Sequence, residues 1–174
     1  MRRTVTAIAV LAGLLLATGA SAAEKPIQLS LWDTIQLNPA SSSVKGLRVV
    51  FLYGANQNVK GLDLGLVTRT RGSQVGVQWG AVHLVDGGFT GWQIGIVNKV
   101  SGEYVGFQEG LVNIADSRMN GLQFGAFNSA GHTEGVQLGL WNTTQTLDGL
   151  QIGIINLIRS GQPRGFLPIV NWSF

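Results

Sequence analysis

The chain has 174 residues, a formal net charge of +3, no cysteine, 25 glycines and only 12% charged residues. The lack of cysteine excludes disulfides and thiolate chemistry, and the lack of a clustered basic face argues against a nucleic-acid partner. A charged fraction of about half the globular average of ~25%, with abundant glycine, predicts ordered β structure with little charged surface.

Residues 1–23 are predicted to be a secretory signal peptide. Arg2 and Arg3 precede an apolar run over residues 7–17, and small residues suited to cleavage follow. The run is shorter than the ~20 residues that a membrane-spanning helix needs. Removal of this segment lowers the net charge to about +1. We therefore expect an exported chain whose residues 24–174 form a single domain.

A repeat occupies most of that domain, over about residues 46–160. After a predicted strand at residues 27–36 and a loop, the unit G-x-Q-x-G-x-x-N recurs seven times, and a degenerate copy begins at Gly46. Successive copies start 15 residues apart five times and then 14 apart twice. A fixed period of this kind is typical of repeat architectures, in which each unit is one structural module.

The alternation inside each unit predicts a β-strand. The second, fourth and sixth positions are large and apolar, for example Trp92, Ile94 and Ile96, and glycine or glutamine lies between them. Loops rich in charges and turn-forming residues separate the units, so we expect one strand and one turn per unit. With the strands at residues 27–36 and 165–174, about ten strands result.

The main prediction is an all-β, up-and-down meander closed as a small barrel of the outer-membrane type. Antiparallel neighbours would place Gly95 opposite Gly110, and the second glycines would form a belt around the wall. Apolar side chains would face lipid, and small or polar ones the interior. The strand at residues 165–174 supports this prediction because it ends in aromatic residues, like the last strand of bacterial outer-membrane barrels.

The alternative is a β-solenoid with one coil per unit. Equivalent side chains would then stack, so the recurring glutamines would form an amide ladder. Adjacent apolar pairs such as Ile96–Val97 and Leu140–Trp141 would mark corners where the inward-facing parity changes. The sequence leaves barrel and solenoid open.

The repeat positions are expected to be structural. The glycine spacing matches neither of the phosphate-binding motifs G-x-G-x-x-G and G-x-x-x-x-G-K-[ST]. The glycines are therefore expected to permit close approach of backbones and tight curvature. The asparagines are assigned to hydrogen bonds with the turning backbone at strand ends. In three representative units these positions are Gly91, Gln93, Gly95 and Asn98; Gly106, Gln108, Gly110 and Asn113; and Gly149, Gln151, Gly153 and Asn156.

No residue set points to catalysis, a metal or a cofactor. His83 and His132 lie in different units without an acidic or sulfur partner at ligand spacing, and no Ser-His-Asp set is recognisable. Glu109 is unusual because it occupies the apolar fourth position of its unit, where an unpaired buried carboxylate would be costly. If the apolar face meets lipid, Glu109 must lie near an interface or a partner, and if that face lines a cavity, Glu109 could contact a ligand. The remaining interpretation is a tolerated exposed position.

The units, the segment LSLW at residues 29–32 and the segment PIVNWSF at residues 168–174 resemble an uncharacterised family of exported bacterial "surface repeat" proteins. The resemblance implies export and surface location, and no activity. Asp63, Thr68 and His83 depart from the pattern.

We therefore expect a non-enzymatic envelope protein with a structural or interaction role, whose partners are outer-membrane lipid and the assembly machinery. The alternatives are a soluble periplasmic or secreted solenoid that binds a partner, and a soluble barrel that binds an apolar ligand.

Overall fold

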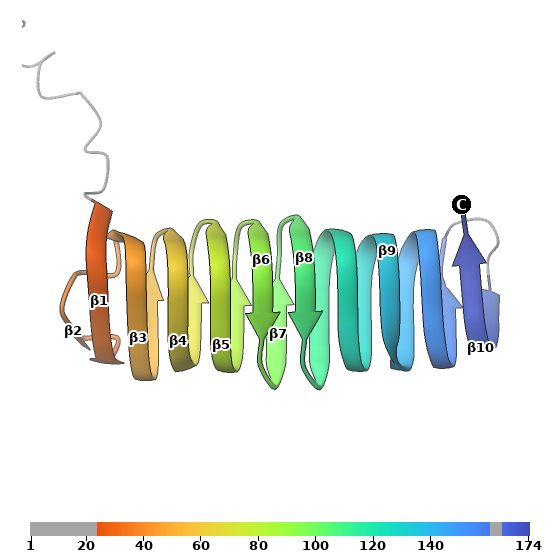
Figure 1. Cartoon of the computed structure of the whole chain (residues 1–174), viewed down its shortest axis with the longest axis horizontal. Coiled ribbons are helices and arrows are strands. Elements are labelled where there is room, and N and C mark those ends of the chain that lie inside the picture. Colours follow the sequence, from red (N-terminus) through yellow and green to blue (C-terminus); the bar gives the residue numbers. More distant parts are fainter. Residues whose placement is uncertain (1–23, 161–164) are drawn as a thin grey trace, which may run out of the picture.

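The computed structural model describes residues 24–160 and 165–174, and the predicted signal peptide lies outside these ranges. Within them no helix has the length and hydropathy required to cross a membrane. The described chain is all-β, and the expected number of about ten strands is confirmed (Figure 1). The strands are β1 (Glu24–Trp32), β2 (Ile35–Gln36), β3 (Ser43–Asn56), β4 (Val59–Thr70), β5 (Gln74–Val85), β6 (Phe89–Ile94), β7 (Val97–Val100), β8 (Tyr104–Glu109), β9 (Val112–Ile158) and β10 (Gly165–Ser173).

The units stack as coils of a β-solenoid, so the barrel prediction is wrong and the alternative is correct. Neighbouring units pair in parallel and in register: Gly91 of β6 lies beside Gly106 of β8, and Gln93 lies beside Gln108. Figure 1 shows the coils side by side along one axis. The predicted antiparallel contact of Gly95 with Gly110 is also wrong. These glycines occupy equivalent corners of successive coils, where a Cβ built on Gly110 would overlap the Gly95 carbonyl.

Each coil contains two strand segments, in contrast to the predicted single strand and turn. In one coil β6 ends at Ile94, the chain turns at Gly95 and Ile96, and β7 returns on the opposite side. In a continuous strand, residues five apart point to opposite faces. Gln93 and Asn98 are five residues apart but both point inward, so the alternation of inward and outward side chains shifts by one residue at this corner. The Ile96–Val97 pair indicated this shift. The long strands β3, β4, β5 and β9 continue around such corners.

The two ends of the solenoid depart from the parallel pattern. The predicted strand at residues 27–36 is two strands, because the chain reverses at Asp33 and Thr34; β2 pairs antiparallel with β1, and β1 pairs parallel with β3. At the other end β10 follows the last coil of β9 backwards, from Gly165 beside Ile158 to Ser173 beside Gly149. Antiparallel strands thus complete both ends of the stack.

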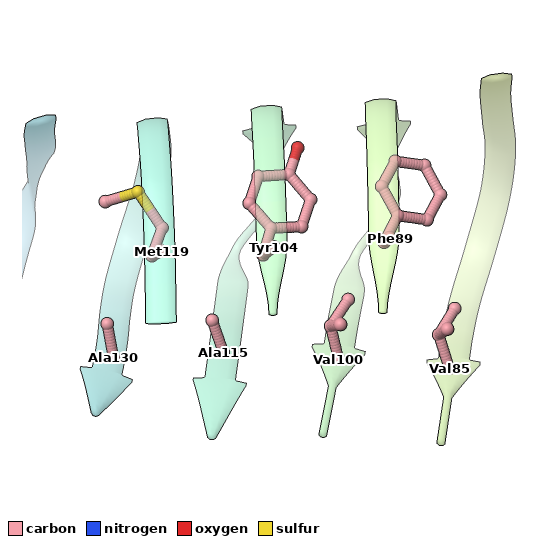
Figure 2. Close-up of a cluster of buried hydrophobic side chains, with 7 residues drawn as sticks. All are labelled: Val85, Phe89, Val100, Tyr104, Ala115, Met119 and Ala130. Atoms are coloured by element: carbon pink, nitrogen blue, oxygen red, sulfur yellow. The ribbon is translucent and has the colours of Figure 1, made fainter. Parts of the chain in front are cut away.

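The apolar core fills one half of the solenoid. Phe89, Tyr104 and Met119 stack along one sheet and face smaller residues, including Val100 and Ala115, on the other sheet (Figure 2). The rings of Phe89 and Tyr104 are nearly parallel, with centroids 5.5 Å apart. Large residues on one side and small residues on the other give a constant sheet separation along the stack. The other half of the interior is polar.

Candidate functional site

A ladder of glutamine amides runs along the solenoid axis beneath the corners of the coils. The Nε2 of each glutamine after the first, Gln78, donates to the glutamine Oε1 of the preceding coil, over distances of 2.7–2.8 Å. All of these side chains have 0% exposure. Because each buried amide finds its partners in the neighbouring rungs, the ladder avoids the desolvation cost of unpaired polar groups. The rungs are Gln78, Gln93, Gln108, Gln123, Gln137 and Gln151.

Asp63 fixes the direction of this ladder. Its carboxylate occupies the rung before Gln78 and can only accept, so Gln78 Nε2 donates to Asp63 Oδ2 at 2.9 Å. The Oε1 of Gln78 is then free to accept from Gln93, and the same orientation passes along the stack. At the far end Asn171 of β10 donates to Gln151. The amide dipoles therefore align with their positive ends toward the carboxylate.

Arg48 pairs with Asp63 in the interior. The Nε and Nη2 atoms of Arg48 lie 2.7 and 2.6 Å from the two carboxylate oxygens, and both side chains have 0% exposure. Arg48 also donates to the Arg69 carbonyl and to Thr70 Oγ1. Burial by itself raises the pKa of Asp63, but the Arg48 charge and the hydrogen bonds from Arg48 and Gln74 outweigh it and hold that pKa below its usual value.

A second ladder, of asparagine amides, supports the corners. The Nδ2 of each asparagine before the last, Asn156, donates to the asparagine Oδ1 of the next coil over 2.8–2.9 Å, in the direction opposite to that of the glutamines. The same Nδ2 atoms donate to backbone carbonyls in the next corner; Asn98, for example, donates to the Glu109 carbonyl at 2.7 Å. A Cβ at Gly110 would meet Asn98 Nδ2 and the Gly95 carbonyl, so the second glycine makes room for this ladder. The rungs are Asn98, Asn113, Asn128, Asn142 and Asn156.

These asparagines lie within the second strand segments, not at strand ends as the sequence analysis expected.

His83 interrupts the asparagine ladder. Its Nε2 lies 2.9 Å from the Ile94 carbonyl, the position at which an asparagine rung donates, and its Nδ1 lies 2.8 Å from Thr68 Oγ1. Because a carbonyl can only accept, Nε2 must carry a proton, and in the neutral ring Nδ1 then accepts from Thr68. Burial lowers the pKa of His83 and outweighs the opposing effect of Asp63. The imidazole offers no donor to Asn98, whose buried Oδ1 has no hydrogen-bond partner within the described part of the chain.

Replacing His83 by asparagine is expected to stabilise the fold by about 1 kcal/mol, because a new rung would donate to the orphaned Asn98 Oδ1. The wild type should lose stability as the pH falls below about 6.5, since unfolded His83 binds a proton that the folded state excludes. His83→Asn should lack this loss. Urea unfolding between pH 8 and pH 5 measures both effects, and an unchanged pH slope in the variant would contradict the assignment.

The outer surface over the ladders is an apolar wedge. We define it as the second, fourth, sixth and seventh positions of the seven units that begin between Gly61 and Gly149; every residue there except Glu109 is apolar. The sixth positions form the tip of the wedge and the other positions its two flanks. Many members are 37–65% exposed: Leu62, Leu66, Val77, Trp79, Trp92, Ile96, Leu111, Phe124, Leu140, Trp141, Ile152 and Ile154.

A shallow groove of about 570 Å³ runs along the wedge. The second glycines, including Gly95, Gly110 and Gly125, form its floor, and fourth- and sixth-position side chains form its walls. Glu109 lies in one wall between Ile94 and Phe124, its register neighbours. The structure thus places Glu109 on the outer surface within the apolar wedge.

Charged residues gather at the opposite edge of the solenoid. Ion pairs there join adjacent coils: Arg69 to Asp86 at 3.0 Å and Lys99 to Asp116 at 3.2 Å. A cross-section therefore passes from a charged edge through the apolar core and the amide ladders to an apolar tip. Because the polar interior lies beneath the apolar surface, this half of the molecule is inverted relative to an ordinary water-soluble domain.

The Arg48–Asp63 pair was not predicted from the sequence, although both residues occupy the third position of successive units, 15 residues apart. The two histidines are far from forming a joint site: His83 belongs to the buried Asp63 cluster, and His132 lies 2.6 Å from Thr146 Oγ1. Within residues 24–160 and 165–174 no group of three or more acidic or histidine side chains could hold a metal ion.

No protein-family model, curated protein or solved structure matches this chain.

Proposed function

We propose that the chain is an exported, non-enzymatic binding module of the cell envelope, and that the apolar wedge is its binding surface. The observation that carries the proposal is the continuity of this surface: seven successive units present apolar residues at every wedge position except Glu109. Monomeric soluble proteins rarely expose contiguous apolar patches of more than a few hundred Å², and larger ones mark interaction sites. Export is supported by the Arg2–Arg3 leader pattern and by the resemblance to surface repeat proteins.

The interior supports binding rather than catalysis. Asp63 and His83, whose pKa values are both lowered, are fully buried. Gln78 donates to Asp63 and to Thr68, and Thr68 is the hydrogen-bond partner of His83. Asp63 and His83 have no path to a substrate and instead hold the first coils together. An apolar ligand inside the molecule, one of the earlier alternatives, has no place here because the interior beneath the wedge is filled by amide ladders.

Fractionation of cells that produce the whole chain tests this proposal. We expect the wild type in the envelope fraction, and we expect the double variant Ile96→Lys, Leu140→Lys to be exported but recovered in the soluble fraction. Val75→Lys is the matched control: Val75 is 44% exposed near the charged edge, and its register partner is Lys60. Cytoplasmic retention of the wild type, or identical fractionation of all three proteins, would refute the proposed function.

A further inference from the structure

We propose that the occupant of the apolar wedge is the hydrocarbon of a lipid leaflet. The solenoid axis would lie parallel to the membrane plane, with the wedge immersed and the charged edge in water. This inference rests on the proposed function and names the partner of the same surface. Four features of the described coils support lipid over a second protein.

The first feature is the shape of the wedge. Apolar side chains cover the tip and both flanks: Ile96 lies at a corner, Trp92 on the flank of the first strand segments and Trp141 on the other flank. A second copy of the chain or another folded protein with a flat face would cover one side and leave the others in water. A fluid hydrocarbon phase surrounds all three sides at once, so the whole apolar surface leaves water.

The second feature is the state of the backbone at the tip. Polar backbone groups at hydrocarbon depth must be bonded within the protein, because lipid offers no partners. In one corner Gly95 N donates to the Glu109 carbonyl and Ile96 N donates to the Ala81 carbonyl. The Glu109 carbonyl also accepts from Asn98 Nδ2. Hydrogen bonds between coils, including those from the asparagine ladder, thus satisfy these backbone groups of the turn without water.

The third feature is the depth of the wedge. The second position of a unit lies four residues from the tip, or about 13 Å along an extended strand at ~3.3 Å per residue. Interfacial proteins bury their apolar faces by about 5–10 Å, so a wedge of this height places its outer residues near the headgroups. Trp92 and Val77 occupy this level, and the amphipathic indole ring favours the membrane interface.

The fourth feature is the distribution of charge. The ion-paired residues lie at the opposite edge, and the domain is close to neutral, so association should depend on apolar contact and little on salt or headgroup charge. Glu109 is the single charged group on the wedge, with Ile94 and Phe124 as its register neighbours. Immersion of a carboxylate is unfavourable, so Glu109 weakens insertion of the central coil.

Vesicle flotation tests the inference, with the whole chain purified without detergent and vesicles of pure phosphatidylcholine. We expect the wild type to float with the vesicles at both 0.05 and 0.5 M salt, with a blue shift of tryptophan emission. Leu111→Lys, at the exposed tip, should weaken partition at least about tenfold, and Glu109→Leu should strengthen it about tenfold. Val75→Lys should leave partition unchanged. Circular dichroism would check that each variant is folded. The stronger vesicle partition expected of Glu109→Leu can be measured even if Leu111→Lys does not fold.

Three results would overturn the inference. First, wild-type protein that stays at the bottom of the gradient with the vesicles present would show that it does not bind lipid. Second, flotation that Leu111→Lys leaves unchanged would assign the association to the leader segment. Third, the wild type could fail to bind vesicles and instead form a dimer that Leu111→Lys dissociates; the occupant of the wedge would then be a second copy of the chain. The proposed binding function would survive this result. The proposed binding function fails only if no association that depends on the wedge is found.

Discussion

Arg48→Gln and Asp63→Gln are each expected to cost about 3–5 kcal/mol of unfolding free energy, because each leaves one fully buried charge without its partner. The double variant should lose much less than the sum. With glutamine at both positions, the ladder would run uninterrupted from Gln28, which lies beside Arg48, to Gln78. Urea unfolding of the four proteins gives the coupling energy between the two sites directly.

The acid behaviour of the same four proteins provides a second readout. The folded-state pKa of Asp63 is below its usual value, so the pair contributes its full stability above the unfolded pKa of ~3.9. This contribution should be lost as the pH falls through the lower, folded-state pKa. The double variant should lack that loss. Additive single effects, or the same acid loss in the double variant, would show that the pair is not a coupled unit.

Gly121→Ala is the second substitution with a large expected effect. Gly121 has φ of 133°, a conformation in which a side chain is strained by about 1–3 kcal/mol. A Cβ there would also overlap the Gly106 carbonyl of the preceding coil. Since backbone atoms of a stacked coil cannot rotate away, we expect a total loss above about 4 kcal/mol, measured by urea unfolding.

Gly165→Ala separates the two causes. Gly165 has nearly the same φ, 138°, but no atom of residues 24–160 or 165–174 lies within 4 Å of a Cβ built on it. This variant should therefore lose only the conformational part, about 1–3 kcal/mol. Equal losses in the two variants would mean that the close approach of coils at the first glycine contributes nothing.

Several features followed from the residues alone. The period of 15 or 14 residues and the alternation around Trp92 and Ile94 predict repeated β units, since side chains in a strand point to opposite faces in turn. The terminal strand at residues 165–174 was predicted with nearly its observed bounds. The apolar wedge positions are visible in the sequence as well, although which medium they face is not.

The choice between barrel and solenoid needed long-range information. The sequence of a unit such as Gly91–Asn98 is compatible with antiparallel and with parallel neighbours, because side chains alternate in the same way in both kinds of sheet. Adjacent apolar pairs such as Ile96–Val97 were the local signs of a corner. Such a pair marks a corner only if Gln93 and Asn98 on either side of it face the same interior. Hydrogen bonds between rungs 14 or 15 residues apart decide this, and they form only when the coils stack.

The sequence by itself determined the class of this protein: a glycine-rich, cysteine-free β repeat with an apolar residue at almost every outward position of its units. Only the tertiary structure decided that Arg48 and Asp63 form an ion pair, that His83 interrupts a ladder of asparagine side chains, and that the wedge lies over a polar interior. The reason is physical. Period and alternation are properties of a single strand, whereas pairing, burial and the inversion of polarity arise between coils that are distant along the chain.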